Sequence, residues 1–590
     1  MNSGRAGHGQ GGDRRRERGV SIKIMVAAAV VIASALMVTL AAQANATRQP
    51  CTSHPVVADV AVSPEIAPAV ETVAKLFNDQ RHLVTGHCAQ VRITSAAPAA
   101  VAAQVDGQGP ANSLPAVDAW VPDSSLWVDV ARSFPMGAQL IQPTGLDVAR
   151  SPLMIVMPAL AAARVPAFGV SVGWSFLLPA ADGGPPSSQH LRVDLPDPTQ
   201  SAAGLATLVQ INRLLGSGAA ARTAFARFVF AAEVTAQFTG PQGLSPFVTL
   251  ARPPLNGNPV TVTSEQAVLQ YDRSHPGQPL AARYPWSPAS ALGSPELDYP
   301  YLLTASQPAQ LAAVRAFGAV LGQSYAAGVV RFDGFRSGNG VADVAPSRYG
   351  LATQLLRLAP EAGASQAQTT LQAWQRVGAN GADLALVDVS APMAAPVGPG
   401  VTLEQELGQT AGLGLSLFPD NTNMGLWEFA DKLSGSRPYK QIVPVGPLTG
   451  ELGLISRRQE LIEANAALKP LPHRAAALNS AILAGYKHMV ASYRPKSSNA
   501  ILVLTSGADN ASDDISLSTL LSDLHQLYNP DRPVQIVIVV FSAHSDFAAM
   551  QQIASATAGS AYEITNPAQI GKVFFEAIAR RICQSSCTGP

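Results

Sequence analysis

Asp388 and Ser390 are the two polar residues whose position could most readily support chemistry. They follow an apolar run inside the stretch Ala382–Pro392. A short run rich in Val and Leu is typical of a strand buried on both faces. Because open α/β sheets bind ligands beyond the carboxyl ends of their strands, an acid and a hydroxyl here could contact a ligand. The simpler interpretation, which we favour, is a strand-end cap that hydrogen-bonds the next loop.

Strands and helices alternate around this pair. Two later apolar runs, Ala500–Gly507 and Val534–Ser542, repeat the strand pattern. Helical spacing places two sets of residues each on one face: Leu478, Ile482, Tyr486 and Met489, and then Leu517, Leu520, Leu521 and Leu524. This alternation predicts a doubly wound α/β domain.

Besides the first strand, residues 382 to 581 contain three distinctive stretches: GLWEFADKLSG (Gly425–Gly435), LNSAILAGY (Leu478–Tyr486) and TSGADN (Thr505–Asn510). Through these stretches the region resembles a von Willebrand factor A domain, which has a Rossmann-like, doubly wound fold. In that family a strand-end Asp-x-Ser-x-Ser, a distant Thr and a distant Asp hold a divalent cation. Mg²⁺ prefers about six oxygen ligands in octahedral geometry.

The resemblance implies a degenerate metal site in this chain. Asp388 and Ser390 match the family pattern, but Pro392, Ala476 and Ser506 stand at the other three positions. Two oxygen ligands of five make a weak site for a hard cation. Mg²⁺ is therefore possible but not expected, and we expect no other cofactor.

The amino-terminal residues have the composition of a membrane signal. Residues 1–23 hold six basic and two acidic side chains, a net charge of +4, and residues 24–42 hold no charge. An apolar segment of about 20 residues can span a bilayer, and the basic residues before it favour the cytoplasmic side. We expect a signal anchor at 24–42, which makes a single-pass plasma-membrane protein with its bulk outside. Cleavage near Ala46, which gives a secreted form, is the alternative.

Several classes of function are disfavoured. The chain has 40 basic and 40 acidic residues, so the part after the basic head carries a net charge of −4. Such a charge gives nucleic acid no reason to bind. There is no Walker loop, no His-Glu-x-x-His and no Gly-x-Ser-x-Gly motif. We therefore expect neither a nucleic-acid partner nor an enzyme.

Four cysteines lie outside the expected membrane segment. In an oxidising compartment disulfides are the default, and four cysteines allow three pairings. Pairing by neighbourhood gives Cys51–Cys88 and Cys583–Cys587. A zinc site at the carboxyl-terminal pair is the alternative, but no histidine is near it.

Residues 51–345 read as a second α/β unit. The predicted strands are Val57–Val62, Gln90–Thr94, Ala116–Val121 and Ser151–Met157. The unit also contains five short motifs: VSPE (Val62–Glu65), DAWVPDSSLW (Asp118–Trp127), DPTQSAAG (Asp197–Gly204), TSEQAV (Thr263–Val268) and LDYPYLL (Leu297–Leu303). Through these motifs it resembles the two-lobed periplasmic solute-binding proteins of bacterial importers. Such proteins hold a ligand between two α/β lobes joined by crossing strands.

The resemblance implies five candidate ligand-binding residues at strand ends and helix starts. They are Ser63, Ser124, Ser125, Thr199 and Ser201. Hydroxyls beside helix N-termini suit an anion, because free N–H groups and the helix dipole point at it. Ordinary helix N-caps are the alternative for each of the five. Trp120, Trp127 and Tyr299 could line the cleft, although aromatic residues at strand ends more often belong to the core.

These features together predict an order of parts and a class of function. The order is a cytoplasmic head (1–23), an anchor (24–42), a solute-binding-like domain (51–345), a helical connector (346–380), an A domain (381–582) and a cysteine-containing tail (583–590). We expect a membrane-anchored binding or interaction protein of the bacterial cell envelope. Its partner would be a protein or a small solute outside the membrane. A solute receptor of an ABC-type importer is the alternative.

Overall fold

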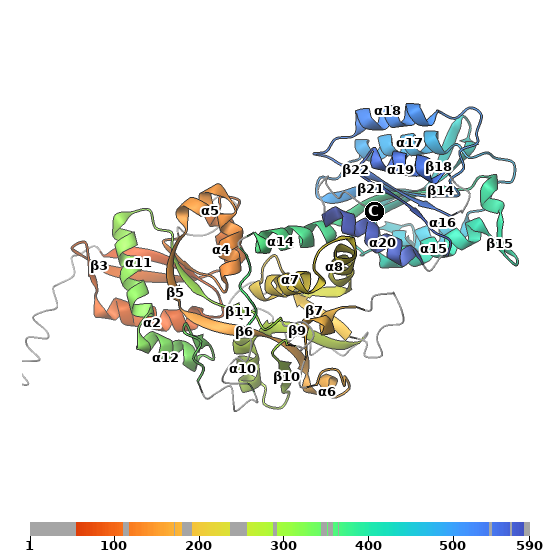
Figure 1. Ribbon diagram of the computed structural model, residues 1–590. Helices are drawn as coiled ribbons and strands as arrows, with labels where there is room; N and C mark the ends of the chain where they lie inside the picture. Colours follow the sequence, from red (N-terminus) through yellow and green to blue (C-terminus); the bar gives the residue numbers. More distant parts are fainter. Residues whose placement is uncertain are drawn as a thin grey trace, which may run out of the picture.

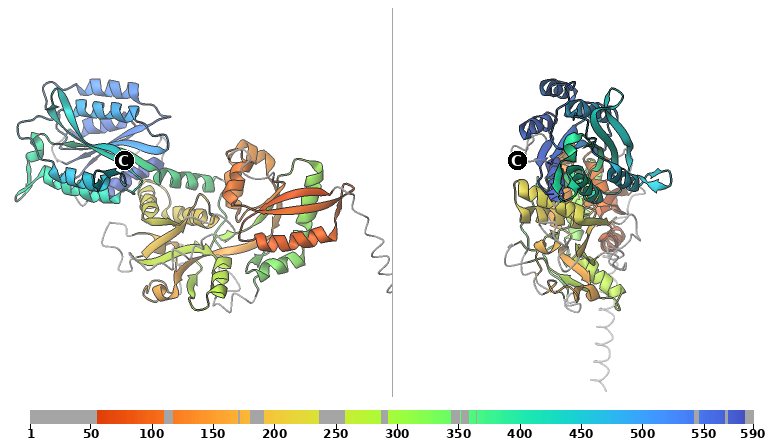
Figure 2. Two further views of the ribbon diagram at one scale, coloured as in Figure 1. Left: turned by 180° about the vertical axis from the view of Figure 1, so that it is seen from behind. Right: turned by 90° about the vertical axis from the view of Figure 1, so that its right-hand side faces the viewer.

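The structure is a computed structural model. It describes residues 55–109, 117–169, 172–179, 191–235, 257–286, 292–343, 351, 358–363, 365–541, 546–566 and 569–582. Three β-sheets follow one another along an elongated molecule, and each sheet carries helices (Figure 1; Figure 2 gives the views from behind and from the side). The predicted α/β class is confirmed.

The first sheet, with its helices, forms the outer lobe. Its strand order is β2-β3-β1-β4-β12-β5. The strands are β1 (Val56–Val62), β2 (Leu83–Val84), β3 (His87–Ser95), β4 (Ala119–Val121), β5 (Gln142–Asp147) and β12 (Pro300–Leu303). The helices are α2 (Ala67–Gln80), α3 (Pro98–Val105), α4 (Ser125–Arg132), α5 (Pro135–Leu140), α11 (Pro308–Leu321) and α12 (Ser324–Phe332). Pro68 lies in the first turn of α2, where a proline forfeits no helical hydrogen bond.

The second sheet forms the inner lobe. Its order is β10-β6-β9-β7-β8, and β11 and β13 also pair with β6. The strands are β6 (Ala149–Pro158), β7 (Leu191–Pro196), β8 (Ala232–Thr235), β9 (Asn258–Ser264), β10 (Leu280–Arg283), β11 (Glu296–Leu297) and β13 (Arg336–Ser337). The helices are α6 (Ala159–Ala162), η1 (Trp174–Leu177), α7 (Ala202–Leu215), α8 (Ala219–Ala231) and α10 (Glu265–Ser274). We call the two lobes together the two-lobed unit (residues 55–343).

Two crossing strands join the lobes, and the chain crosses between them a third time from α12 to β13. The chain leaves the first sheet at β5 and enters the second at β6, and it returns from β11 to β12. Between them, the Val148 amide donates to the Tyr299 carbonyl at 3.0 Å. Tyr299 has a φ of 42°, which is unusual for a non-glycine residue and costs conformational energy. The crossing is therefore a short, defined hinge between two separate sheets.

The third sheet belongs to the C-terminal unit (residues 380–582). Its order is β18-β17-β14-β21-β22-β23, with β17 and β18 antiparallel and the other pairs parallel. The strands are β14 (Asn380–Asp388), β17 (Asn423–Ser434), β18 (Arg437–Pro447), β21 (Ser497–Thr505), β22 (Val534–Val540) and β23 (Ser560–Glu563), with small ribbons β15 (Pro396–Gly398), β16 (Val401–Thr402), β19 (Glu451–Leu452) and β20 (Ile455–Ser456). The helices are α15 (Leu403–Leu417), α16 (Arg457–Ala467), α17 (Leu478–Ala491), α18 (Leu517–Leu527), α19 (Phe547–Ser555) and α20 (Ile570–Ala579), with short turns η2 (Ala391–Ala394) and η4 (Arg580–Ile582).

Both faces of the third sheet are covered, which explains the apolar run in β14. Leu384 and Leu386 pack with α17, α18 and α19 on one face. Ala385 and Val387 pack on the other face with residues of α15, α16 and α20. Successive side chains of a strand point to opposite faces, so a strand covered on both sides must be apolar throughout. This arrangement is the predicted doubly wound sheet.

The two units share a contact through the last helix. Phe574 of α20 packs edge-on against Phe230 of α8, with ring centroids 5.6 Å apart. Phe574 and Ile578 belong to the same buried cluster as the core of the two-lobed unit. Before the third sheet, within the helical connector predicted at 346–380, the structure describes helix α14 (Gln366–Val377). Residues 344–350 and 352–357 lie outside the described residues.

The amino-terminal predictions fall outside the described residues. These predictions are the basic head, the anchor at 24–42 and the cleavage site near Ala46. Within the part of the chain that the structure describes, no helix is both long and apolar enough to cross a membrane. Cys88 forms a disulfide, and no cysteine among the described residues is free. The other three cysteines are not described, so the pairings Cys51–Cys88 and Cys583–Cys587 stay predictions.

Candidate functional sites

Ser63 and Ser124 follow neighbouring strands of the first sheet. Ser63 comes directly after β1, and Ser124 comes shortly after β4, which is parallel to β1. The Ser63 amide donates to the Val121 carbonyl at 2.9 Å, so the two strand ends are held together. The Ser63 hydroxyl donates to the Glu65 carboxylate at 3.0 Å. The carboxyl ends of these strands thus gather hydroxyl and carboxyl groups at one edge.

Ser124 and Ser201 act as helix N-caps. The Oγ of Ser124 accepts from the Leu126 amide at the start of α4, at 3.3 Å. The Oγ of Ser201 accepts from the Gly204 amide at the start of α7, also at 3.3 Å. Both side chains are buried. The capping alternative therefore describes the bonds that these two hydroxyls make.

Ser125 and Thr199 also have partners inside the chain. Ser125 is exposed, and its amide donates to Asp298 Oδ1 at 2.7 Å. The amide and hydroxyl of Thr199 both donate to Asp197 Oδ1, at 2.9 and 2.8 Å. Ser125 therefore hydrogen-bonds a residue of the crossing between β11 and β12, whereas Thr199 hydrogen-bonds a residue of its own loop.

Asp123 joins the two lobes directly. It follows β4 in the outer lobe, and its Oδ2 accepts from the Ala202 amide at the start of α7 in the inner lobe, at 3.3 Å. The other oxygen, Oδ1, is buried and has no hydrogen-bond partner among the described residues. The carbonyl of Asp123 accepts from the Tyr299 amide at 3.4 Å. A carboxylate of the chain itself thus occupies the helix start at which the sequence suggested an external anion.

Several carboxyl groups lie close together between the lobes. We call this place, formed by Glu65, Asp123, Asp298 and Tyr299, the seam. The pKa of Asp123 lies well above its usual range, first because it is buried and then because Glu65 and Asp298 carry like charge. Burial also raises the pKa values of Glu65 and Asp298. Tyr299 is fully buried, its hydroxyl has no partner among the described residues, and burial and the three carboxyls raise its pKa well above 10. The seam therefore has an excess of acidic groups.

Sequence reasoning missed Asp123 and Glu65, although both lie inside motifs that it singled out. The available signal was position, because each carboxyl stands next to a predicted hydroxyl directly after a strand. Trp120 and Trp127 are buried core residues.

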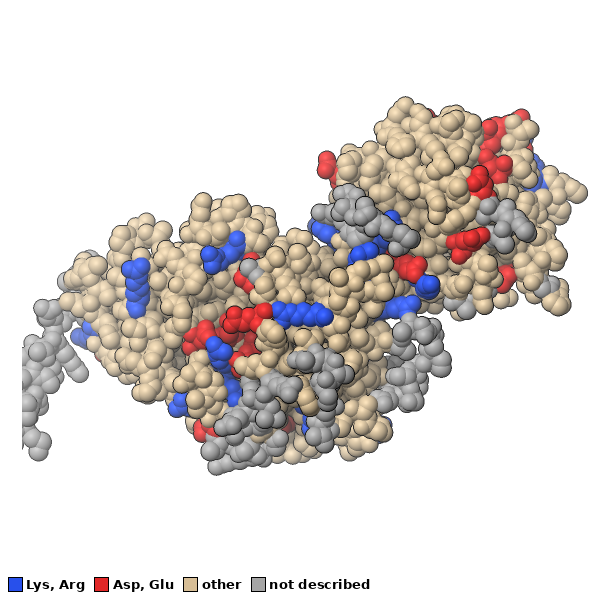
Figure 3. Space-filling view, viewed as in Figure 1, with Lys and Arg blue, Asp and Glu red and all other residues tan. Residues whose placement is uncertain are grey.

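On the face shown in Figure 3, most of the surface is uncharged, and acidic and basic side chains lie side by side near the middle of the two-lobed unit.

In the C-terminal unit, Asp388 is fully buried at the end of β14. Its Oδ1 accepts from the Ser390 amide at 2.9 Å, and its Oδ2 accepts from the Thr505 hydroxyl at 2.8 Å and from the Ser506 amide at 3.4 Å. Burial raises the pKa of Asp388, while these hydrogen bonds lower it. The Ser390 hydroxyl is buried and has no partner among the described residues. Asp388 thus connects the loop after β14 to the loop after β21.

The remaining positions of the implied metal site supply few oxygen ligands. Ala476 is buried, and its amide donates to Asn510 Oδ1 at 2.7 Å. Asp509 accepts from the Leu478 amide at the start of α17, at 3.2 Å, and from the Asn479 side chain at 2.7 Å. Burial and nearby Asp514 raise the pKa of Asp509 to about 7. Among the described residues, no group of three or more His, Cys, Asp or Glu could hold a metal ion.

Comparison with known families identifies the two-lobed unit. Residues 58–336 match the model of the bacterial extracellular solute-binding protein family. This range begins in β1 and ends in β13, so it covers both sheets and both crossing strands. The chain therefore contains a solute-binding-protein-like domain.

Whole-chain relatives and solved structures were also found. The uncharacterized proteins MT1884 and Rv1836c of Mycobacterium tuberculosis are each 26% identical over 606 residues, covering 94% of this chain and 82% of theirs. The sulfate-binding protein SubI of M. tuberculosis is 18% identical, covering 50% of this chain and 91% of its own, with a TM-score of 0.33. Iron-bound HitA of Pseudomonas aeruginosa is 13% identical (55% and 100% covered, TM-score 0.36). A von Willebrand factor type A protein of Catenulispora acidiphila is 14% identical (35% and 43% covered, TM-score 0.27).

Proposed function

We propose that this chain is a binding protein of the bacterial cell envelope that takes a small polar solute at the seam of its two-lobed unit. The observation that carries this proposal is the unmatched polar pair at the seam. Asp123 Oδ1 and the Tyr299 hydroxyl are buried and lack partners among the described residues. Buried polar atoms in folded proteins are nearly always hydrogen-bonded, so this unmatched pair between the two lobes is where the polar groups of a ligand would find partners.

The charge of the seam favours a solute that donates hydrogen bonds or carries positive charge. The negative charges of Glu65 and Asp298 raise the pKa of Asp123, and the same two carboxyls with Asp123 raise the pKa of Tyr299. Acidic groups therefore outweigh basic groups in their effect on this seam. A cationic solute would relieve this repulsion, whereas an oxyanion would add to it and would have to displace Asp123 from α7. The anion expected from the hydroxyl pattern is therefore the less favoured ligand. The solute would enter when the lobes separate at the crossing strands.

A ligand screen with matched variants tests this assignment. We expect small amines and metal cations, but not sulfate or phosphate, to raise the melting temperature of the full chain. Asp123→Asn should weaken binding by about ten- to a hundredfold, because hydrogen bonds to charged groups contribute about 1.5–3 kcal/mol. Asp79→Asn changes an exposed carboxyl on α2 and should bind like the wild type. Stabilisation by oxyanions alone, or unchanged binding by Asp123→Asn, would contradict the proposal.

An interaction role is preferred over a dedicated importer receptor. The observation that favours it is the contact between α20 and α8, which attaches a complete second α/β unit to the inner lobe. An importer receptor needs both lobes free to meet a permease and has no use for this addition. The C-terminal unit, which we propose is a von Willebrand A-type domain, would then recognise a protein partner. Transport of the bound solute, lost on deletion of a permease, would support the importer alternative.

We also propose that the C-terminal unit works without a bound cation. Both carboxylate oxygens of Asp388 are already hydrogen-bonded, and Ala476 and Pro392 offer no side-chain oxygen. Millimolar Mg²⁺ or Mn²⁺ should therefore leave the melting transition of this unit unchanged in the full chain. Partner binding should survive EDTA. Micromolar Mg²⁺ affinity in calorimetry, abolished by Asp388→Ala, would restore a cation-dependent adhesion site.

The membrane anchor and the disulfides complete the proposal. The basic head followed by residues 24–42 supports an uncleaved anchor with its amino terminus in the cytoplasm. Peptide mapping of the native protein without reduction should recover peptides from residues 1–23 and a Cys51–Cys88 link. A mature amino terminus at Thr47 would show a secreted form instead. Metal bound at Cys583 and Cys587 would exclude a disulfide there.

A further inference from the structure

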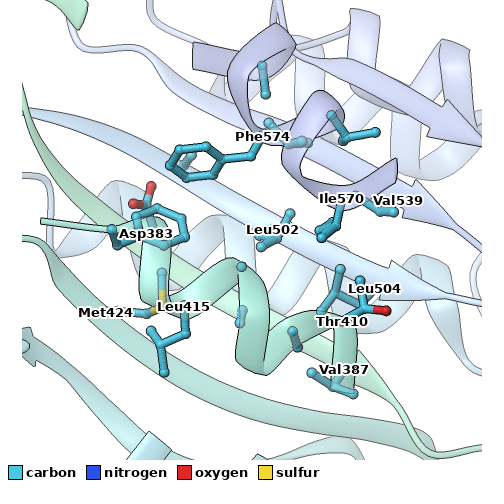
Figure 4. A pocket seen from close by; sticks show the side chains of 18 of the residues that line it. Asp383, Val387, Thr410, Leu415, Met424, Leu502, Leu504, Val539, Ile570 and Phe574 are labelled. Carbon is cyan, nitrogen blue, oxygen red and sulfur yellow. The ribbon is translucent and has the colours of Figure 1, made fainter. Parts of the chain in front are cut away.

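One face of the third sheet is incompletely filled. An apolar pocket lies between this face and helices α15, α16 and α20, and it holds about 1170 Å³ of space counted out to its open mouth. Figure 4 shows side chains from both the sheet and the helices that surround it. Its floor consists of alternate residues of three parallel strands: Ala385, Val387, Leu502, Leu504, Val537 and Val539. Ligand pockets in proteins are mostly apolar with a small number of polar groups, and this pocket has the same character.

Small residues leave the space open. Gly412 and Gly414 of α15 and Ala577 of α20 line the pocket where larger side chains would fill it. A Cβ added at Gly414 would meet nothing closer than Ile570 Cγ1, at 3.8 Å. Ile462 of α16 also lines the pocket and is 40% exposed, so the opening to solvent lies near it.

The pocket has one polar end. Asp383 lines it at the start of β14, and its Oδ2 is buried without a partner among the described residues. Arg581 lines the same end, and its electrostatic attraction partly offsets the cost of burying Asp383. The hydrogen bond that Arg581 makes, to the Ala379 carbonyl, is long at 3.4 Å. Figure 4 shows the Asp383 carboxyl at one side of the pocket and Val387 and Thr410 at the other.

We propose that this pocket binds a single-chain lipid with an uncharged, hydrogen-bonding head group, as in a monoacylglycerol. The apolar floor extends from Asp383 to Val387, about 13 Å at about 3.3 Å per residue, and suits a hydrocarbon chain. Burying apolar surface on both partners drives such binding. At the polar end, the acid and the guanidinium offer both acceptors and donors with little net charge. This pair favours hydroxyl groups over a carboxylate or an ammonium. The inference concerns the C-terminal unit and is independent of the solute proposed for the two-lobed unit.

Photochemical labelling of the full chain tests this lipid site. The chain is placed in phospholipid nanodiscs with a monoacylglycerol that carries a diazirine on its acyl chain, and the labelled peptides are mapped by mass spectrometry. We expect labels on peptides of β21 and α20 and competition by 1-monooleoylglycerol. Oleate and oleylamine should compete at least tenfold less well, because each places a net charge at the Asp383–Arg581 end.

Two filling variants separate pocket binding from general lipid contact. Gly414→Leu should fill the pocket and lower labelling at least tenfold without lowering the melting temperature, because the added side chain meets open space. Gly328→Leu makes the same change on α12, where an added Cβ meets nothing within 4 Å, and should label like the wild type. Leu502→Trp is a second filling variant from the strand side. The proposal would be overturned if the wild type were not labelled, or if Gly414→Leu and Leu502→Trp were both labelled as strongly as the wild type. Competition by oleate as effective as that by 1-monooleoylglycerol would also overturn it.

Discussion

Arg336→Met should destabilise the inner lobe by about 3–5 kcal/mol. Arg336 donates two hydrogen bonds to Glu265, from Nε at 3.0 Å and from Nη2 at 2.8 Å, and both side chains are almost completely buried. The Tyr284 hydroxyl donates to the same carboxylate. Removing the guanidinium would leave Glu265 as a buried charge, with this phenol as its remaining side-chain partner among the described residues. Loss of one partner of a buried ion pair typically costs about 3–5 kcal/mol.

The control for this prediction is a surface ion pair in the same two-lobed unit. Arg92 pairs with Asp59 at 2.5 Å, but the Arg92 side chain is 66% exposed, so water screens the attraction. Arg92→Met should therefore change stability far less than Arg336→Met does. Calorimetric melting of both variants measures the difference. The double variant Arg336→Met with Glu265→Gln should recover part of the loss, because no charge is then left unpaired. Equal effects of the two single variants would show that Glu265 is not held as a buried charge.

Asp383→Asn should stabilise the C-terminal unit at neutral pH and much less at acidic pH. Burial raises the pKa of Asp383 from 3.8 to about 6. The folded state therefore binds its proton more tightly than the unfolded state, and the wild type loses stability as the pH rises from about 4 to about 6. A shift of about two pKa units corresponds to about 3 kcal/mol. The advantage of the variant should grow by roughly this amount between pH 4 and pH 7 and stay constant above it.

A carboxyl with the opposite shift provides the control for Asp383. Lys432 lowers the pKa of exposed Asp513, with which it forms an ion pair at 2.6 Å. Asp513→Asn should give a small loss of stability above pH 4, opposite in sign to Asp383→Asn. The melting transition of the C-terminal unit, followed at several pH values, decides between them. A constant difference between Asp383→Asn and the wild type from pH 4 to pH 7 would mean that Asp383 titrates normally.

The elements and their order could be predicted from the sequence because local patterns specify them. The run before Asp388 is apolar at every position, and only a strand covered on both faces needs that pattern. Pro68 and the serines before α4 and α7 mark helix starts through their own backbone chemistry. The alternation of strand and helix patterns also predicted the α/β class. The resemblance to periplasmic solute-binding proteins implied a solute-binding-like domain, which the family match supports.

The chemistry of both sites depends on contacts between distant parts of the chain. Asp123 meets Ala202 across 79 residues of sequence, and Arg581 approaches Asp383 from the far end of the C-terminal unit. No local pattern encodes such contacts, because they arise only when separate sheets and helices pack. For the same reason the sequence indicated an anion beside the seam hydroxyls, whereas the folded chain places its own carboxylate there. The space beneath α20 likewise exists only because small residues from α15 and α20 meet one face of the sheet.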